Sequence, residues 1–295
     1  MEPRLDYNLP EAQYHADRTS LSSSGARTLL RSPKGFQHQL NNPTSSEDMD
    51  LGSLVHALVL GQPHPFYERT WGWNTIEGRK QGAEFASQVS GTPRDDFYVD
   101  GKVVEAQIIR DVLDAHGRLE ITAAKWKAAH DMADSLFEHE EACELLTNGK
   151  PEVSGYATCP ITRVRMRGRF DWLREDGHKI DLKTARDGSV GAFRKDSAPW
   201  KYDYPLQAAW YTEIAEMNGI RHPDFTFIVV EKVEPYPVTL IRFDEDTMRS
   251  ARRRALEARE LYREYALLDY WPHRNGSQGV NTISVPDWDA APTLA

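Results

Sequence analysis

The chain has 295 residues, a formal net charge of −9 and 40% hydrophobic residues, which is ordinary for a soluble globular protein. No apolar run approaches the roughly 18 residues that cross a bilayer, and the first 18 residues contain no signal-peptide core, so we expect a cytoplasmic protein without membrane contact. The two cysteines, Cys143 and Cys159, are too few for a four-thiolate zinc site or an iron–sulfur cluster and indicate a reducing compartment.

The first half of the chain is predicted to be mainly helical. Residues 1–18 show no regular pattern, whereas serine and threonine caps predict a helix over 19–40 that Pro33 divides into two. The remaining elements of this half, in chain order, are a polar loop at 41–50, a buried helix at 51–61, a mostly irregular segment at 62–101, and amphipathic helices near 102–116 and 122–147.

The second half is predicted to form a sheet with helices packed on it. Residues 225–232 form a continuous β-branched and aromatic run, which is typical of a strand buried on both faces. A long charged helix over 245–268 follows, with Asp244 as its N-cap. The other elements of this half are strands at 152–159, 163–173, 178–183 and 236–243, a helix at 202–219 and a loose tail from 275.

The chain shows no internal repeat and no sharp linker, which favours a single domain over residues 1–275. Within it we expect a helical part at 15–150, a sheet core at 151–245 and a C-terminal helix at 245–270, with a flexible tail at 276–295. This order of elements predicts the α/β fold class, with a mixed α+β sheet.

Two arginine-rich stretches stand out from the acidic background. Residues 163–169 hold four arginines in seven positions, and residues 249–259 hold five in eleven. An acidic protein is by itself a poor binder of nucleic acid, because non-specific binding depends on neutralising phosphates. These stretches therefore leave open a locally basic groove.

The hairpin "GRFDWLREDGHKIDLKTA" at 168–185 places two acids and a lysine in strands that otherwise read as core. Side chains of a strand alternate between its faces, so Asp181 and Lys183 point the same way, and Asp171 on the neighbouring strand can lie across from them. Buried carboxylates that repel each other are neutralised by a divalent cation, which the ammonium group can assist in phosphodiester hydrolysis.

A surface hairpin with an Asp–Lys ion pair is the alternative, and the short motif alone favours it. The apolar Ile180 and Leu182 on either side of Asp181 indicate a half-buried strand, which favours the metal site. Glu152, at the start of the first strand of the sheet core, is a third candidate acid. Its alternative is an exposed glutamate at the end of a strand.

Three further polar residues lie on predicted helices. His56 sits in an apolar helix, where a satisfied core histidine is the commoner case, although the small residues Gly52 and Ser53 one turn earlier would let another element come close. Gln207 and Tyr211 are spaced i and i+4 on one helix face and can bind a phosphate or orient a catalytic lysine. An ordinary amphipathic helix surface explains the same spacing equally well.

Taken together, these stretches resemble a known family. "SLSSSGARTLLRSPKGF", "GSLVHALVLG", "PEVSGY", "RGRFDWL", "IDLKTA" and "YPLQAAWY" occur in the order found in the PDDEXK nuclease superfamily. More narrowly, they resemble its phage and prophage exonuclease VIII (RecE-type) branch, over about residues 14 to 245. The resemblance implies a restriction-endonuclease-like core with a helical N-terminal region.

The resemblance also implies roles for individual residues. The implied metal ligands are Asp171, Asp181, the Leu182 carbonyl, His56 and Glu152, the last of which completes the acidic set or acts through a water. Lys183 is the implied catalytic lysine, and Gln207 and Tyr211 belong to the helix motif that follows it. The implied cofactor is Mg²⁺ or Mn²⁺, one or two per site, without an iron–sulfur cluster.

The family's substrate is linear duplex DNA, digested 5′→3′ by ring-shaped oligomers that leave 3′ single strands for a RecT-like annealing protein. A candidate 5′-phosphate pocket near the N-terminus contains Ser22, Arg27, Arg31 and Lys34. A capped helix with a solvated face is the likelier alternative on the residues alone. Two other functions stay open: an endonuclease or single-strand or RNA nuclease of the same fold, and a non-catalytic ring protein that binds DNA ends.

Overall fold

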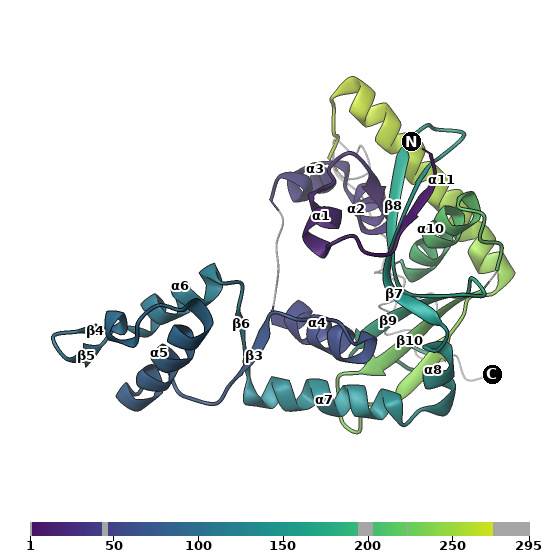
Figure 1. Cartoon of the computed structure of the whole chain (residues 1–295). Coiled ribbons are helices and arrows are strands. Elements are labelled where there is room, and N and C mark those ends of the chain that lie inside the picture. The colour runs from purple at the N-terminus through teal and green to yellow at the C-terminus, as the bar shows by residue number, and fades with distance from the viewer. Residues whose placement is uncertain (1, 43–46, 194–202, 223, 274–295) are drawn as a thin grey trace, which may run out of the picture.

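A mixed sheet forms the centre of the protein. The computed structural model describes residues 2–42, 47–193, 203–222 and 224–273. Within them the sheet has seven strands in the order β1-β7-β8-β9-β10-β11, with β2 beside β8 (Figure 1). These strands are Arg4–Asp6 (β1), Leu21–Ser22 (β2), Gly149–Thr158 (β7), Arg165–Arg174 (β8), Lys179–Ala185 (β9), Phe225–Glu231 (β10) and Val238–Ile241 (β11). The predicted α/β class with a mixed sheet is confirmed.

The middle of the sheet combines antiparallel and parallel pairs. The strands β7, β8 and β9 follow one another as antiparallel neighbours, whereas β9 and β10 are parallel. A parallel pair needs a crossover connection, and the helix α10 (Tyr204–Met217) lies within that connection. Residues 225–230 of β10 are all buried, which agrees with the prediction of a strand covered on both faces.

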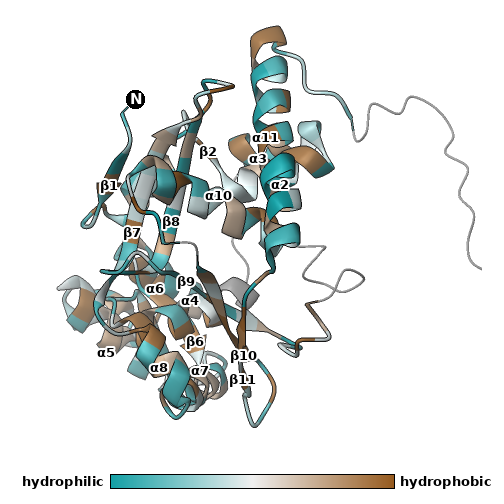
Figure 2. Cartoon of the chain, turned by 90° about the vertical axis from the view of Figure 1, so that its right-hand side faces the viewer, coloured by the Kyte–Doolittle hydropathy of each residue, from teal (hydrophilic) through white to brown (hydrophobic). Residues whose placement is uncertain are grey.

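Helices cover both faces of the sheet, and the alternation of strand side chains divides them into two cores. Phe227 and Val229 join the core under α2, α10 and α11, while Ile228 and Val230 join the core with α4 and α7. The outward surface of α11 is mostly hydrophilic (Figure 2). The helices named here are Ser23–Arg31 (α2), Glu47–Leu60 (α4), Ala123–Phe137 (α7) and Glu245–Leu268 (α11). None of the described helices is long and apolar enough to cross a membrane.

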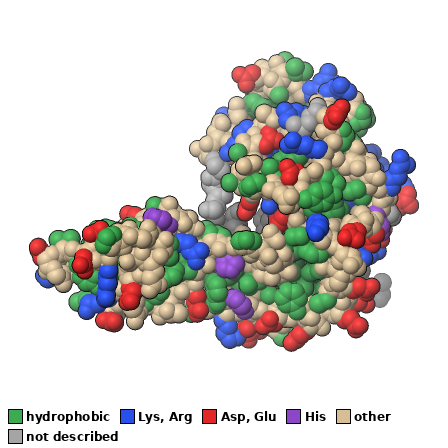
Figure 3. Space-filling view, in the orientation of Figure 1, with side chains coloured by type: hydrophobic (Ala, Val, Ile, Leu, Met, Phe, Trp, Pro, Cys, Tyr) green, Lys and Arg blue, Asp and Glu red, His purple; other side chains and the backbone are tan. Residues whose placement is uncertain are grey.

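An arm between residues 70 and 118 stands clear of the sheet (Figures 1 and 3). It leaves and rejoins the body through the parallel pair β3 and β6, and the side chains of Trp73, Phe97 and Ile109 give it a small core of its own. The connecting strands are Phe66–Arg69 (β3) and Leu119–Thr122 (β6), and the elements of the arm are Ile76–Ser90 (α5), Arg94–Phe97 (η1), Tyr98–Val99 (β4), Lys102–Val103 (β5) and Ala106–Ala115 (α6).

The prediction of a mostly irregular segment at 62–101 is therefore wrong. Two of the five glycines in this segment, Gly78 and Gly82, lie inside α5, where they allow close packing. A Cβ atom at Gly82 would lie 2.3 Å from the ring of Trp73, and one at Gly78 would lie 1.9 Å from the Gly72 carbonyl oxygen. Glycine lowers the intrinsic stability of a helix, so tertiary packing outweighs propensity here.

Two other sequence predictions need correction. Residues 1–18 are not irregular, because β1 pairs with β7 and a short helix α1 (Glu11–Ala16) follows. A three-residue strand has no sequence pattern of its own until its partner is known. The single helix predicted at 122–147 is two helices, α7 and α8 (Glu140–Leu145), and the second begins where the His139 side chain accepts a hydrogen bond from the Ala142 amide.

Several boundaries agree with the predictions. Pro33 separates α2 from α3 (Pro33–Asn41), Gly61 follows α4 with a positive φ of 62°, and Asp244 caps α11 by accepting from the Thr247 amide at 2.8 Å. The loop expected at 41–50 is shorter, because α4 begins at Glu47, and its residues 43–46 lie outside the described part. The tail at 276–295 also lies outside it, and the single-domain division stays a prediction.

Candidate active site

The site begins where two strands share one edge of β8. One edge of β8 is occupied by β7 along its whole length, so β2 and β9 must both pair with the other edge. β2 pairs at Met166–Arg167 and β9 at Trp172–Leu173. Between these two pairings β8 and β9 diverge, which opens a fork in the sheet at Asp171.

Three predicted acids lie in a row across the fork. Glu152 and Asp171 lie between the β7–β8 pairs Pro151↔Trp172 and Val153↔Phe170, and Asp171 and Asp181 come directly after the last β8–β9 pair, Trp172↔Ile180. The charges of Asp181 and Glu152 both act on Asp171, so the three carboxylates are near one another. The Oδ2 atom of Asp171 accepts a hydrogen bond from the Leu182 amide at 2.7 Å, so the carboxylate satisfies a main-chain donor that the diverging strands leave free.

Asp181 and Lys183 form a buried ion pair. Only 1% of Asp181 is exposed, its Oδ2 atom contacts the Lys183 ammonium group, and its Oδ1 atom accepts from the Gln207 amide group at 2.6 Å. The rings of Tyr204 and Phe227 lie 5.6 and 5.8 Å from the Lys183 nitrogen. The alternative of an exposed Asp–Lys pair on a surface hairpin is therefore wrong.

His56 reaches the same point from α4. Its Nδ1 atom lies 3.7 Å from Asp171 Oδ2, and it makes a hydrogen bond to the main chain of Leu182. Loss of contact with water, together with the charge of Lys183, lowers the pKa of His56 to about 4. The ring is therefore neutral near pH 7 and keeps a lone pair, as a metal ligand must.

The carboxylates of the fork are under electrostatic strain. Burial and then the charge of Asp181 raise the pKa of Asp171 well above its usual range. For Lys183, burial acts to lower the pKa, but the charges of Asp181 and Asp171 outweigh it, and the pKa lies above the usual value. The Lys183 ammonium group therefore stays charged, and its single positive charge compensates only part of the negative charge of Asp171 and Asp181.

Gly52 allows α4 to approach β9 closely. A Cβ atom at Gly52 would lie 3.2 Å from the Thr184 hydroxyl oxygen on β9, and His56 follows one helical turn later. The sequence argument that Gly52 admits a close neighbour is confirmed. The close contact between helix and strand positions His56 against Asp171.

Replacing Gly52 with valine is expected to push α4 away from β9 and to move His56. Because small displacements of catalytic groups are costly, the DNA hydrolysis that the resemblance implies should fall by about tenfold or more. The exposed neighbour Ser53 provides the control, and Ser53→Ala should leave the rate unchanged. Equal rates for Gly52→Val and Ser53→Ala, measured on the same DNA, would show that this contact does not position the histidine.

The structure places Glu152 beside the cluster with a partner of its own. Its carboxylate accepts from the Arg169 Nε atom, and Arg169 also donates to the Leu9 carbonyl oxygen at 3.2 Å. The charge of Glu152 still contributes to the raised pKa of Asp171, so the two carboxylates are near each other. Arg169 was missed as a site residue, although strand alternation places it on the same face as Asp171.

The two members of the helix motif behave differently. Gln207 contacts Asp181, whereas Tyr211 packs against β8. A Cβ atom at Gly168 would lie 2.9 Å from the Tyr211 ring, and the ring of Phe170 meets it edge-on with centroids 5.4 Å apart. Tyr211 therefore supports the strand that carries Asp171.

The four candidate DNA-binding residues have separate surroundings. The Ser22 hydroxyl group accepts from the Gly25 amide at 3.1 Å and caps α2, as the capped-helix alternative predicted. The Lys34 ammonium group lies 3.2 Å from His273 Nε2, and the charge of Arg27 acts on Asp203. Arg31 is exposed at the end of α2. Ser22 ends β2 and pairs with Arg167 on the edge of β8 that also carries the fork.

The arginine-rich stretches mostly serve internal contacts. The guanidinium groups of Arg167 and Arg169 lie over the Tyr14 ring, at 4.8 and 5.6 Å. On α11, Arg252 pairs with Glu216 and Arg259 with Glu213. These contacts give several of the clustered arginines internal partners, and the basic groove stays untested.

The sequence matches a family described as "PDDEXK-like domain of unknown function (DUF3799)" over residues 22–281. The chain belongs to this family. A crystal structure of a protein from Eubacterium rectale, named "Putative exonuclease", is similar to this PDDEXK-like chain with a TM-score of 0.56 and 14% identity, and the match covers 96% of this chain and 98% of that one. At this identity the similarity shows the fold alone. No curated protein matches the sequence.

The PDDEXK-like core predicted from the sequence is confirmed, while the narrower exonuclease VIII assignment stays a prediction. Domains of this fold typically use divalent metal ions, and the residues present fit such an ion. Asp171 and Asp181 supply oxygens whose mutual repulsion a cation would relieve. The Leu182 carbonyl and the neutral His56 imidazole complete a donor set suited to Mg²⁺ or Mn²⁺.

Proposed function

We propose that this protein is a metal-dependent exodeoxyribonuclease that digests linear double-stranded DNA. One observation supports this most strongly: Asp171, Asp181, His56 and Lys183 come from three elements and meet at one fork in the sheet. Membership of a PDDEXK-like family and the similarity to a protein named as a putative exonuclease point the same way.

Each residue has a defined part in the proposed reaction. Asp171, Asp181, His56 and the Leu182 carbonyl would hold one or two divalent ions, which supply positive charge for the scissile phosphate and lower the pKa of a bound water. The Lys183 ammonium group stabilises negative charge that develops on the phosphate. Gln207 fixes the orientation of Asp181, and Arg169 holds Glu152 beside the acidic pair.

The finer features of the proposal come from the resemblance to exonuclease VIII. We propose digestion 5′→3′, which leaves 3′ single strands for a RecT-like annealing protein, by a homo-oligomeric ring. Ser22, Arg27, Arg31 and Lys34 would meet the terminal 5′-phosphate. Ser22 supports this best, because it ends β2 on the edge of β8 that also carries the fork.

A comparison of DNA substrates tests the activity and its direction. With Mg²⁺, linear duplex should be degraded whether its strands are labelled at the 5′ or at the 3′ end. The 5′ label should be lost first, because digestion 5′→3′ starts at the 5′ terminus. Closed circular duplex and single-stranded DNA should persist under the same conditions. Loss of the circle would instead show an endonuclease, and early loss of the 3′ label would reverse the proposed polarity.

A further inference from the structure

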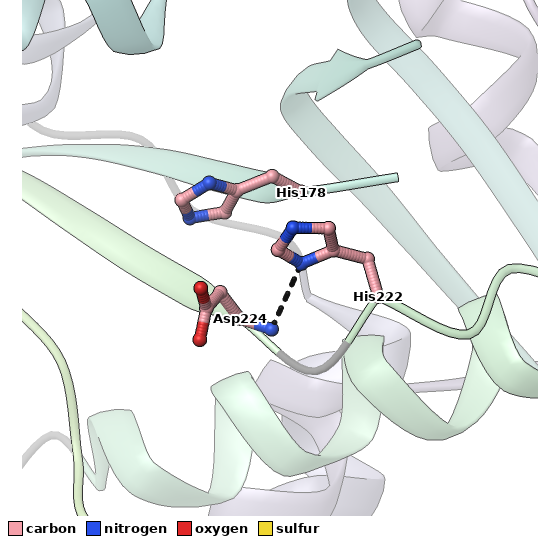
Figure 4. A group of neighbouring side chains, drawn as sticks. All are labelled: His178, His222 and Asp224. Atoms are coloured by element: carbon pink, nitrogen blue, oxygen red, sulfur yellow. Dashed lines mark hydrogen bonds between the residues drawn. The ribbon is translucent and has the colours of Figure 1, made fainter. Parts of the chain in front are cut away.

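A second group of metal-binding side chains lies at the start of the parallel strand pair. The register pairs Lys179 of β9 with Phe225 of β10, so the preceding residues, His178 and Asp224, are also opposite each other. His222 lies two residues before Asp224, and its carbonyl oxygen accepts from the buried Lys179 ammonium group. Figure 4 shows His178 and Asp224 at the two strand starts and His222 on the loop that leads into β10.

The three side chains are close enough to share an ion. One ligand atom of His178, one of His222 and one of Asp224 all lie within 4.8 Å of one another. Zinc binds imidazole nitrogen and carboxylate oxygen at about 2.0–2.2 Å in a tetrahedral arrangement, which places its ligand atoms about 3.4 Å apart. Closing the group by about an ångström is within reach, because His222 and Asp224 are only partly buried.

Neighbouring groups already hold the three side chains in place. Nε2 of His178 lies 2.8 Å from the Thr226 hydroxyl oxygen, and the Asp224 amide donates to Nδ1 of His222 at 3.2 Å. That second bond means that the lone pair of His222 is on Nδ1, beside Asp224, where a metal ion can replace the weak bond. The rings of His178 and His222 are parallel and 5.1 Å apart, so a turn of the His222 ring is needed to bring both to one ion.

The surrounding charges determine which ion fits. Arg242 donates to Asp224 Oδ2 at 3.0 Å and to the Thr226 hydroxyl oxygen at 2.8 Å, and Lys179 lies against the same loop. Any metal ion would displace Arg242 from Asp224, and Mg²⁺ or Ca²⁺ would then find only one carboxylate where they need an all-oxygen ligand set. Two imidazoles and one carboxylate instead suit Zn²⁺, whose bonds to nitrogen depend less on net charge.

We propose that His178, His222 and Asp224 form a Zn²⁺ site separate from the nuclease centre. Asp181 follows His178 by three residues, about 10 Å along β9. The ion joins the starts of β9 and β10 to the loop after α10 and so stabilises the strand that carries Asp181 and Lys183. An open cavity of about 370 Å³, lined in part by His178, Arg242 and Glu144, adjoins the group on the side of His178.

Zinc titration of the full chain tests the site without depending on nuclease activity. The Asp171→Asn variant serves as the parent, since it removes a carboxylate from the nuclease centre. Calorimetry with Zn²⁺ should give about one tight site per chain and a rise in melting temperature, and excess Mg²⁺ should not displace the ion. In that parent, His222→Gln or Asp224→Asn should weaken Zn²⁺ binding by about 100-fold and remove the rise.

The control is His116→Ala, an exposed histidine on the arm, which should bind Zn²⁺ like the parent. Both variants of the site change partly exposed side chains, so they should fold, and the melting temperature without metal verifies this. An unchanged Zn²⁺ affinity and stoichiometry in His222→Gln and Asp224→Asn would overturn the proposal. Displacement of the ion by Mg²⁺ would overturn the assignment to zinc.

Discussion

The Asp171→Asn protein is expected to lose metal-dependent hydrolysis while becoming at least as stable as the unmodified protein, which is the parent in the comparisons that follow. The substitution removes a metal-binding charge, and losing about 3 kcal/mol of transition-state stabilisation lowers the rate about a hundredfold. The asparagine Oδ1 atom can still accept from the Leu182 amide, so the fork keeps its hydrogen bond. Rates on linear duplex, together with melting temperatures without metal, measure both effects.

The gain in stability has a predicted pH dependence. The pKa of Asp171 is raised in the folded protein by burial and by Asp181, so the folded state binds this proton more tightly than the unfolded state. Below its unfolded pKa of about 4, Asp171 therefore does not lower the free energy of unfolding. The destabilisation grows as the pH rises from there toward the folded pKa. The melting temperatures of variant and parent should agree at low pH and separate above it.

Asp187→Asn is the matched control, because Asp187 is exposed and also accepts from a main-chain amide, that of Ser189. It should change neither the rate nor the melting temperature. An Asp171→Asn protein that digests DNA at the parent rate would remove Asp171 from the proposed chemistry. A lower melting temperature at neutral pH would contradict the electrostatic strain inferred at the fork.

Replacing Lys183 with methionine is expected to separate catalysis from metal binding. Loss of the ammonium group should lower the hydrolysis rate about 10²- to 10³-fold, as for other groups that stabilise transition-state charge. The variant should bind Mn²⁺ as tightly as the parent or more tightly, because a cation beside the carboxylates has gone. Titration with Mn²⁺, followed by its electron paramagnetic resonance signal, measures the binding.

The same substitution leaves Asp181 and Asp171 buried without their counter-ion. Breaking a buried ion pair costs about 3–5 kcal/mol, so the variant should melt lower than the parent without metal. Mn²⁺ should recover more of the melting temperature in the variant than in the parent. Lys150→Met, at an exposed lysine, is the control and should show neither effect. Lost Mn²⁺ binding in Lys183→Met would show that the lysine acts by holding the site together.

The hairpin that carries the acids was predictable because its information is local. Alternating polar and apolar residues between 168 and 185 show which side chains share a face, and one turn brings the two strands together. Asp171, Asp181 and Lys183 therefore meet in the structure as the alternation predicted. The helices at Pro33 and Asp244 were predictable for the same reason, since caps and proline act within one helical turn.

Other contacts depend on residues far apart in the chain. His56 lies 115 positions before Asp171, and only the close packing of Gly52 against Thr184 shows that α4 reaches the fork. The helix α5 in the arm was not predicted because glycines such as Gly82 suggest a loop in the sequence. Only the structure shows that the Trp73 ring packs against Gly82. The role of Glu152 as a third acid stays a prediction, and its pairing with Arg169 depends on the β7–β8 register.

By itself, the sequence determined the strands of the hairpin, the acids and lysine that share its face, and the resemblance to a PDDEXK nuclease. Only the tertiary structure decided which distant side chains complete the site, namely His56 and Gln207, and brought His178, His222 and Asp224 together at the strand starts. The physical reason is range: periodicity and capping act over a few residues. Strand register and helix packing instead depend on the total apolar surface that distant segments bury together.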